Sequence, residues 1–304
     1  MFAYADCLGC GTTYLVDPPF DLAPYYPSDY IRTGRVPRVV RERLRRRDLE
    51  PRLRLAAAQP GDTVLDVGCA RGDFLVEMRR RGWTVAGIEP TAHLANEALA
   101  LGIPVWADEL ASARVPARRF DLVTLWDVLE HLDDPHADLV RARSLLRPGG
   151  RLIVNTPLAD GWDARVFGHA WSGWDAPRHY TVFTRTSLTR LLAGAGFAIE
   201  SWHRVFETYL ITALTLALAA RRHAPPPAAR AVWLWLHARP VRLGMEPVFA
   251  ALDRAGGASS MAVVAVPSGQ AQDRSAGEDG YEAAGVRSLV SAALTGSETE
   301  HLCA

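Results

Sequence analysis

A strand, a turn of small residues and a helix follow one another in residues 64–75 and decide the fold expected for this chain. The stretch reads VLDVGCARGDFL, with the turn from Gly68 to Gly72 and the helix starting at Asp73. Glycine lets a backbone approach a ligand closely, and the first turn of a helix offers free N–H groups. The stretch therefore predicts a parallel α/β sheet with a ligand-binding loop at one strand end.

Short apolar runs elsewhere in the chain supply the other strands. They are bounded by Gly, Pro or Asp, and helical patterns lie between several of them. This alternation predicts an α/β fold, a Rossmann-like seven-stranded and mostly parallel sheet with helices on both faces. The expected strands are Thr63–Val67, Thr84–Ile88, Phe120–Leu125, Arg151–Asn155, Ser187–Leu192, Ala198–Trp202 and Met261–Val266, and the expected helices are Asp73–Arg81, Ala92–Leu101 and Pro135–Leu146.

The composition describes an ordinary globular protein without a global charge. The 304 residues include 34 basic and 34 acidic side chains, and every basic one is arginine. The absence of lysine excludes Schiff-base and P-loop-lysine chemistry, and the neutral charge gives no field that recruits nucleic acid. Four cysteines are too few for a secreted disulfide framework. We therefore expect a cytoplasmic protein without a nucleic-acid partner.

Two features bear on the ligand of the loop, and only the glycine pattern separates its two candidates, because both carry a ribose. Aligned with the dinucleotide pattern G-x-G-x-x-G, the loop places Gly68, Ala70 and Asp73 on the glycine positions, so only the first matches. A carboxylate at Asp73 would oppose a pyrophosphate at the helix N-terminus, whereas S-adenosylmethionine carries no phosphate and two positive groups. Glu89 ends the next strand at the spacing of a carboxylate that accepts both ribose hydroxyls. S-adenosylmethionine is therefore favoured over NAD.

Four segments from the loop onward form a longer pattern. They read LDVGCARG at 65–72, GIEP at 87–90, FDLVTLWDVLEHLDDP at 120–135 and LRPGGRL at 146–152. Together they resemble the class I S-adenosylmethionine-dependent methyltransferases, in particular the ubiquinone-biosynthesis-like branch. The segments WSGWDAPRHYTVF at 171–183 and AGF at 195–197 are similar to the same branch. The chain departs from the family at Ala70, where a glycine is usual; alanine there is compatible with binding if its φ is negative.

The resemblance implies where the cofactor binds. Its expected contacts are Asp66, Gly68, Cys69, Ala70 and Gly72 in the loop, Glu89 and Pro90 after the second strand, Asp108 near the adenine, and Trp126 and Asp127 after the strand at 120–125, which is the fourth strand in the family's order. Each of these residues also has a plain structural reading. The loop could be a tight turn without a ligand, and Asp108 could be a surface carboxylate.

The acceptor is expected to be a small molecule, a sugar or a lipid-linked compound, methylated at oxygen or carbon. No Asn-Pro-Pro-Tyr, Asp-Pro-Pro-Tyr or Pro-Cys motif follows the fourth strand, which disfavours methylation of nucleic-acid bases. A hydroxyl acceptor needs a general base, and His131 and His179 are the candidates because histidine titrates near neutrality. Two alternatives remain: a non-catalytic S-adenosylmethionine-binding assembly partner and an NAD-dependent oxidoreductase.

Four regions organise the chain. Residues 1–59 form a lead-in with Cys7-x-x-Cys10 and an arginine-rich helix, and residues 60–157 form the cofactor-binding core. Residues 158–267 hold an aromatic insertion, apolar helices and the last strands, and residues 268–304 are expected to be disordered. We expect residues 1–30 to be irregular. Cys7 and Cys10 make half of a zinc knuckle, and tetrahedral zinc needs four ligands, so no metal site is expected; either the site has decayed or the true start lies upstream.

Two further patterns suggest a membrane surface. The apolar stretch 205–220 has almost no polar face and is followed by Arg221 and Arg222, and a second arginine run spans 41–47. The longest apolar run of the chain, 209–220, is shorter than the ~20 residues that cross a bilayer. The plain reading is helix packing or a dimer contact. We hypothesise instead a reversible, peripheral contact with a membrane surface.

Overall fold

A seven-stranded sheet forms the centre of the protein in the computed structural model, which describes residues 2–21, 23–25, 49–56, 61–205, 208–236 and 238–269. The strand order is β5-β4-β3-β6-β7-β10-β9. Neighbours from β5 to β7 are parallel, whereas β10 runs antiparallel to both β7 and β9. The strands are β3 Thr63–Val67, β4 Thr84–Ile88, β5 Val105–Trp106, β6 Phe120–Trp126, β7 Leu146–Pro157, β9 Phe197–His203 and β10 Ser260–Pro267. The predicted α/β class and mostly parallel sheet are confirmed.

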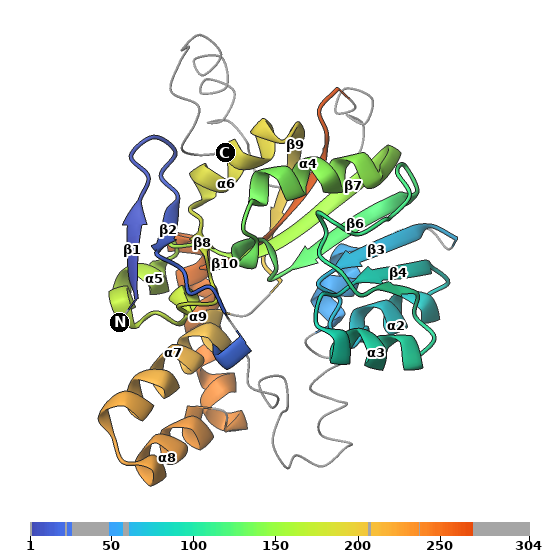
Figure 1. Ribbon diagram of the computed structural model, residues 1–304. Helices are drawn as coiled ribbons and strands as arrows, with labels where there is room; N and C mark the ends of the chain where they lie inside the picture. The colour runs from blue at the N-terminus through green and yellow to red at the C-terminus, as the bar shows by residue number, and fades with distance from the viewer. Residues whose placement is uncertain are drawn as a thin grey trace.

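Helices cover both faces of this sheet (Figure 1). On one face α4 (Pro135–Leu145) and α6 (Arg185–Gly194) pack against alternate strand residues such as Leu65 and Val154. On the other face α2 (Asp73–Arg80), α3 (Ala92–Ala100) and the helix at 49–55 pack against Val64 and Ile153. Side chains alternate between the faces of a strand, so a strand covered on both sides is apolar throughout.

One predicted strand is wrong. Residues 187–192 belong to helix α6. Thr184 accepts a hydrogen bond from the Ser187 N–H and the Ser187 hydroxyl accepts one from the Thr184 N–H, which forms a capping box that starts the helix. Leu188 and Leu192 lie one turn apart and are fully buried in the core. The apolar run therefore has helical spacing, and β10 and β9 complete the sheet without it.

The N-terminal lead-in is a β-hairpin in its described part rather than the expected irregular segment. Strands β1 (Ala3–Asp6) and β2 (Thr13–Val16) pair antiparallel, and β2 also pairs with β8 (Thr181–Val182) of the insertion. Cys7 and Cys10 flank the hairpin turn. The Tyr4 hydroxyl lies 2.6 Å from the carbonyl of Trp174 and 2.9 Å from that of His179. The hairpin thus fixes the insertion that carries His179.

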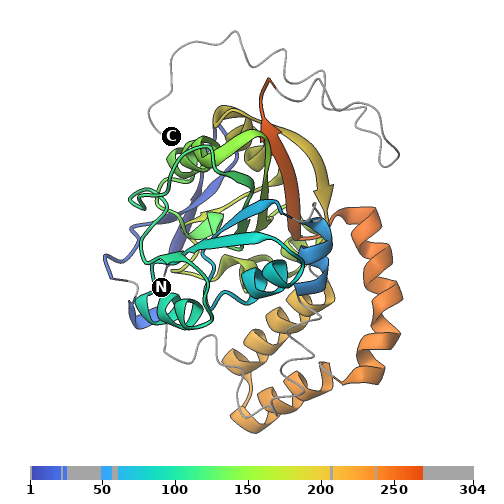
Figure 2. The ribbon, with the colours of Figure 1, turned by 90° about the vertical axis from the view of Figure 1, so that its right-hand side faces the viewer.

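The remaining elements lie at the carboxyl ends of the strands and beyond. Short helices are η1 (Ala23–Tyr25), η2 (Leu129–His131), α5 (Trp162–Phe167), η3 (Gly168–Ala170) and η4 (Ser172–Trp174). Three longer helices, α7 (Thr208–His223), α8 (Pro226–Leu236) and α9 (Arg239–Gly256), project away from the sheet (Figures 1 and 2). Within the described ranges, no helix is long and apolar enough to cross a membrane. The arginine run 41–47 and tail residues 270–304 lie outside the described residues.

Gly87 in β4 provides a test of this packing. A Cβ atom at this position would overlap the Sγ of Cys69 and lie 3.1 Å from the Leu75 Cδ1. We expect Gly87→Ala to lower the free energy of unfolding by about 1–3 kcal/mol, because a dense core accommodates an added methyl poorly. Gly244→Ala in α9 is the control; nothing lies within 4 Å of its added methyl, and helix propensity predicts a gain of roughly 0.5–1 kcal/mol. Urea unfolding curves that coincide for the two variants would contradict the packing.

Candidate functional site

The turn between β3 and α2 has the backbone shape that only small residues adopt. Gly68 and Gly72 have φ angles of 69° and 76°. The N–H groups of Gly68 and Cys69 both donate to the Ile88 carbonyl, at 2.8 and 3.0 Å, which joins the turn to the end of β4. A Cβ atom on Gly68 would lie 2.5 Å from the Val128 Cγ2. Gly68 is therefore required by its φ and by close packing, whatever ligand the loop holds.

Glu89 directly follows β4 and is fixed by two backbone groups. Its side chain is buried, its Oε2 accepts the Ala70 N–H at 2.9 Å and its Oε1 accepts the Thr91 N–H at 2.8 Å. A carboxylate has about four lone-pair positions, so each oxygen can still accept another hydrogen bond. Glu89 is thus held in one orientation with acceptor capacity left for a ligand hydroxyl.

Ala70 lies at the departure from the usual glycine pattern. Its φ is 47°, in the left-handed region, so the negative φ that the sequence reading required is not found. An L-residue with a Cβ pays roughly 1–2 kcal/mol for this conformation. The Ala70 N–H donates to Glu89, and this hydrogen bond helps to hold the turn in its strained shape.

Asp66 is a buried carboxylate beneath the loop. It is 3 % exposed, and the Thr124 hydroxyl donates to its Oδ1 at 2.6 Å. Burial raises the pKa of Asp66 to about 7, the Thr124 hydrogen bond and the positive charge of Arg52 oppose the rise, and the negative charge of Glu89 adds to it. A cation bound near this group would favour its ionised form.

A second carboxylate, Asp127, stands at the end of β6 with a φ of 56°. The Asn155 amide donates to its Oδ1 at 2.6 Å, and the Arg52 guanidinium lies 3.1 Å from its Oδ2. Arg52 also lies 5.3 Å from the centre of the Trp126 ring, which packs edge-on against Phe74. Asp127 is therefore held between two donors in a strained backbone position, as is common at functional sites.

The two candidate bases, His131 and His179, come together although 48 positions separate them in the chain. Their ring centres are 4.7 Å apart. The Nδ1 of His131 donates to the Arg178 carbonyl at 2.7 Å and that of His179 to the Gly173 carbonyl at 2.8 Å. Because a carbonyl only accepts, both protons sit on Nδ1 and each Nε2 keeps its lone pair. Burial lowers the pKa of His131, and lowers that of His179 to about 3.

Glu130 joins this pair and was not identified from the sequence. It is 1 % exposed, and its Oε2 accepts the Thr156 hydroxyl at 3.0 Å. Burial raises its pKa well above the ordinary value, with a further contribution from Asp127. A carboxylate oxygen of Glu130 and a ring nitrogen of each histidine lie within 4.8 Å of one another. The cluster can share protons, and the residue types also suit a divalent cation, although the sequence led us to expect no metal site.

The remaining expected cofactor contacts differ in burial. Pro90 and Asp108 are exposed; the Oδ1 of Asp108 accepts the Glu109 N–H at 2.9 Å and the Ser112 hydroxyl at 2.5 Å, so Asp108 shapes the turn after β5. Cys69 is buried against Gly87, and burial raises the pKa of its thiol. Gly72 approaches Ala98, where an added Cβ would lie 3.2 Å from that side chain, and so packs α2 against α3.

Arg52 and Asn155 were also missed from the sequence. Asn155 stands near the end of β7, which is a signal for the strand-end edge, whereas Arg52 comes from the helix at 49–55 and had no local signal.

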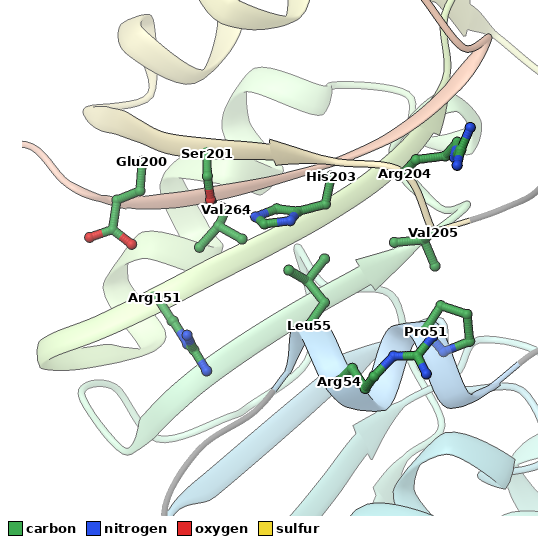
Figure 3. Close-up of a pocket in the computed structure, with 10 residues that line it drawn as sticks. All are labelled: Pro51, Arg54, Leu55, Arg151, Glu200, Ser201, His203, Arg204, Val205 and Val264. Carbon is green, nitrogen blue, oxygen red and sulfur yellow. Dashed lines mark hydrogen bonds between the residues drawn. The ribbon is translucent and has the colours of Figure 1, made fainter. Parts of the chain in front are cut away.

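A cavity of about 460 Å³ lies elsewhere, between the helix at 49–55 and strands β7, β9 and β10 (Figure 3). Its lining includes Arg54, Arg151 and Glu200, and none of the residues described above. We therefore place the candidate site at the loop edge and not in this cavity.

Comparison with known proteins decides the family. The "Methyltransferase domain" family model matches residues 40–201, more than half of the chain. The chain belongs to this methyltransferase domain family. Ubiquinone biosynthesis O-methyltransferases are similar to its central part: that of Aeromonas salmonicida is 33% identical over 103 residues, 32% of this chain and 43% of the relative, and that of Hahella chejuensis is 37% identical over 109 residues, 33% and 45%. The chain thus spans less than half the length of these relatives.

Solved methyltransferase-related structures share the fold. A chain of the complex of the Haloferax volcanii Trm112 methyltransferase activator with its partner aligns with a TM-score of 0.52 and 16% identity, covering 76% of this chain and 93% of that one. Geranyl diphosphate C-methyltransferase from Streptomyces coelicolor A3(2) aligns with a TM-score of 0.49 and 17% identity, covering 74% and 81%. At these identities the first likeness supports the sheet architecture and nothing more specific.

Ala70 allows the strain in the loop to be measured. We expect Ala70→Gly to raise the free energy of unfolding by about 1 kcal/mol, because glycine adopts a positive φ without a Cβ penalty. Ala251→Gly, in an exposed interior position of α9, should lower it by roughly 0.5–1 kcal/mol. Thermal or urea unfolding would show the two variants moving in opposite directions, and a loss of stability in both would argue against strain at Ala70.

Asp66 predicts a pH dependence of stability. Its pKa rises from 3.8 to about 7 on folding, so the folded protein binds a proton there that the unfolded chain has released. This contribution to stability is complete below pH 3.8 and is lost as the pH rises through about 7. Wild type should therefore lose stability relative to Asp66→Asn between pH 5 and 7, by at most about 1.4 kcal/mol per pH unit. A constant difference across that range would contradict the raised pKa.

Proposed function

We propose that this chain is an S-adenosylmethionine-dependent methyltransferase that acts on an oxygen of a small-molecule acceptor. The observation that supports it most is the buried Glu89, fixed by the Ala70 and Thr91 N–H groups at the mouth of the glycine turn. A preoriented carboxylate of this kind can accept the two hydroxyls of a ribose, which is the part of the cofactor that Glu89 would bind. The family membership and the similarity to O-methyltransferases support the reaction type.

The charges around the turn suit a cationic cofactor. S-adenosylmethionine supplies an electrophilic methyl group on a sulfonium, which leaves as a neutral thioether. Asp66 and Asp127 would stabilise its positive groups, and the backbone of Cys69, Ala70 and Gly72 would line it. Pro90 and Asp108 would border the adenine, and Trp126 at the end of β6 would form one wall of the site. A buried carboxylate with a raised pKa such as Asp66 favours a bound cation over a pyrophosphate.

His131 is the better candidate for the general base. Both histidines keep the Nε2 lone pair, because each donates its Nδ1 proton to a carbonyl. The pKa of His179, about 3, makes it a weak proton acceptor, whereas His131 is less buried. His131 would accept the proton of an acceptor hydroxyl, and His179 and Glu130 would position its ring. Methyl transfer to a good nucleophile depends chiefly on alignment and exclusion of water, so the base assists deprotonation only.

The insertion between β7 and β8 would cover the acceptor. Trp171 is buried and packs edge-on against Trp174, which also contacts Tyr4 of the N-terminal hairpin. These aromatic contacts support the insertion, whose His179 packs against His131, and an apolar lid there would exclude water. We further propose that the acceptor is lipid-linked, which would agree with the apolar helices α7, α8 and α9 that follow the insertion in the chain.

Glu89→Ala tests the cofactor part of the proposal. We expect the affinity for S-adenosylmethionine, measured by calorimetry, to fall by about 1–3 kcal/mol, the range for hydrogen bonds to a charged group. Glu77→Ala is the matched control, since Glu77 pairs with Arg80 within α2 and outside the glycine turn, and this variant should bind normally. With methyl-labelled cofactor and a host extract, wild type should label a small molecule and Glu89→Ala should not.

Three results would contradict the proposal. Equal affinity in wild type and Glu89→Ala would remove Glu89 from the site, provided that both variants unfold at similar temperatures. Tight binding of NAD in place of S-adenosylmethionine would favour an oxidoreductase. Binding without label in any extract fraction would favour a non-catalytic assembly partner. Repeating the transfer with a chelator would show whether a cation on Glu130, His131 and His179 is required.

A further inference from the structure

The helices α7, α8 and α9 expose an unusual amount of apolar surface. Of the 20 large hydrophobic side chains that are exposed among the described residues, 10 belong to these helices. The most exposed are Trp235 at 62 %, Leu234 at 60 % and Leu243 at 55 %. On α9, Met245, Val248 and Leu252 follow at helical spacing. Exposed apolar side chains gathered on neighbouring helices in this number are typical of an interaction surface.

Buried contacts join the three helices to one another and to the rest of the protein. Tyr209 and Phe249 pack against each other and bury Leu236, and the Tyr209 hydroxyl donates to the Leu236 carbonyl. Asp253 accepts the Trp162 indole N–H at 3.2 Å and pairs with Arg204 at the end of β9. Figures 1 and 2 show α7 and α8 extending beyond the sheet from this attachment. The outer faces of the helices are therefore left for a partner.

The charge of this segment identifies the kind of partner. Residues 208–256, which hold the three helices, contain six arginines, one glutamate and one aspartate, a net charge of four positive charges. The chain as a whole is neutral, so the remaining residues carry the opposite excess, and the segment that holds the three helices is the positively charged one. Apolar side chains combined with arginines and tryptophans are typical of helices that lie in the interface of an anionic bilayer.

A second copy of the chain fits this surface less well. A two-fold dimer brings the same patch of both subunits together. The two segments, each with four net positive charges over residues 208–256, would then repel each other. An anionic lipid headgroup supplies the missing negative charge, and the acyl region takes up Leu234, Trp235 and Leu243.

We propose that α7, α8 and α9 form a lipid-docking surface that lies on an anionic membrane without crossing it. The surface is connected to the candidate site, because the Ser172 N–H donates to the Thr215 hydroxyl of α7 at 3.1 Å. Gly173, the next residue, accepts the hydrogen bond of His179. Docking through α7 would thus bring the acceptor-side insertion close to the bilayer. This consequence for the acceptor rests on the proposed function, whereas lipid docking itself does not.

Vesicle flotation of the full chain tests the proposal. Vesicles of phosphatidylcholine with 30 mol% phosphatidylglycerol should carry the protein upward, and pure phosphatidylcholine vesicles should carry much less. The double variant Leu234→Gln, Leu243→Gln should reduce the partition coefficient at least about tenfold, because each substitution replaces an apolar side chain that enters the acyl region by a polar one. The control double variant Leu99→Gln, Leu101→Gln, on exposed positions at the end of α3, should partition like wild type. Raising NaCl from 50 to 500 mM should weaken binding.

Several outcomes would overturn lipid docking. These are no flotation with either vesicle, equal flotation with both at all salt concentrations, or an equal loss in the two double variants. A dimer of the full chain in light scattering that only the Leu234→Gln, Leu243→Gln variant disrupts would assign the surface to a second copy. Cofactor affinity is measured on the same samples. Normal affinity without flotation refutes the docking surface alone, and flotation without cofactor binding refutes the proposed function alone.

Discussion

The structure depends on one buried interaction, the Glu89 carboxylate that accepts the N–H groups of Ala70 and Thr91. Through it the turn after β3 and the turn after β4 are fixed relative to each other, although 19 positions separate Ala70 from Glu89. Hydrogen bonds from backbone N–H groups offset the cost of burying the charge, since an unpaired buried carboxylate would be strongly destabilising. The same two bonds hold Ala70 in a left-handed conformation that it would not otherwise adopt.

Several acidic groups gather at the strand-end edge. Asp66, Glu89 and Glu130 are all buried there, and Asp127 lies beside them between Arg52 and Asn155. Burial raises the pKa of Asp66 and of Glu130. Buried carboxylates that lie close together repel one another when they are ionised, and a bound cation lowers the free energy of their ionised forms. This balance is consistent with a sulfonium ligand, and it accounts for the position of the site at this edge.

Sequence reasoning reached the central sheet because its strands are short, apolar and separated by clear helix signals, as in Thr63–Val67 and Thr84–Ile88. It failed at residues 187–192, where an apolar run was assigned to a strand although Thr184 and Ser187 form a helix cap. It also missed the N-terminal hairpin, whose two strands are only four residues long, and the pairing of β2 with the distant β8. Such long-range pairing leaves no local pattern.

Some residues of the candidate site could likewise be identified from the sequence and others could not. Gly68 and Glu89 could be identified because glycine turns and strand-end carboxylates occur at fixed spacings. Arg52 and Glu130 could not, since their roles come from the helix at 49–55 and from the contact of η2 with the insertion. The conformation of Ala70 was also beyond sequence reasoning, because the φ of a loop residue is set by its hydrogen bonds.

A crystal structure of the protein with S-adenosylhomocysteine tests the central claim most directly. The account predicts both ribose hydroxyls within hydrogen-bond distance, about 2.6–3.2 Å, of the Glu89 carboxylate, which keeps its bonds to Ala70 and Thr91. The thioether sulfur should face Asp127 and His131. A ligand bound in the cavity between the helix at 49–55 and β9, or a Glu89 side chain that makes no contact with the ribose, would contradict it.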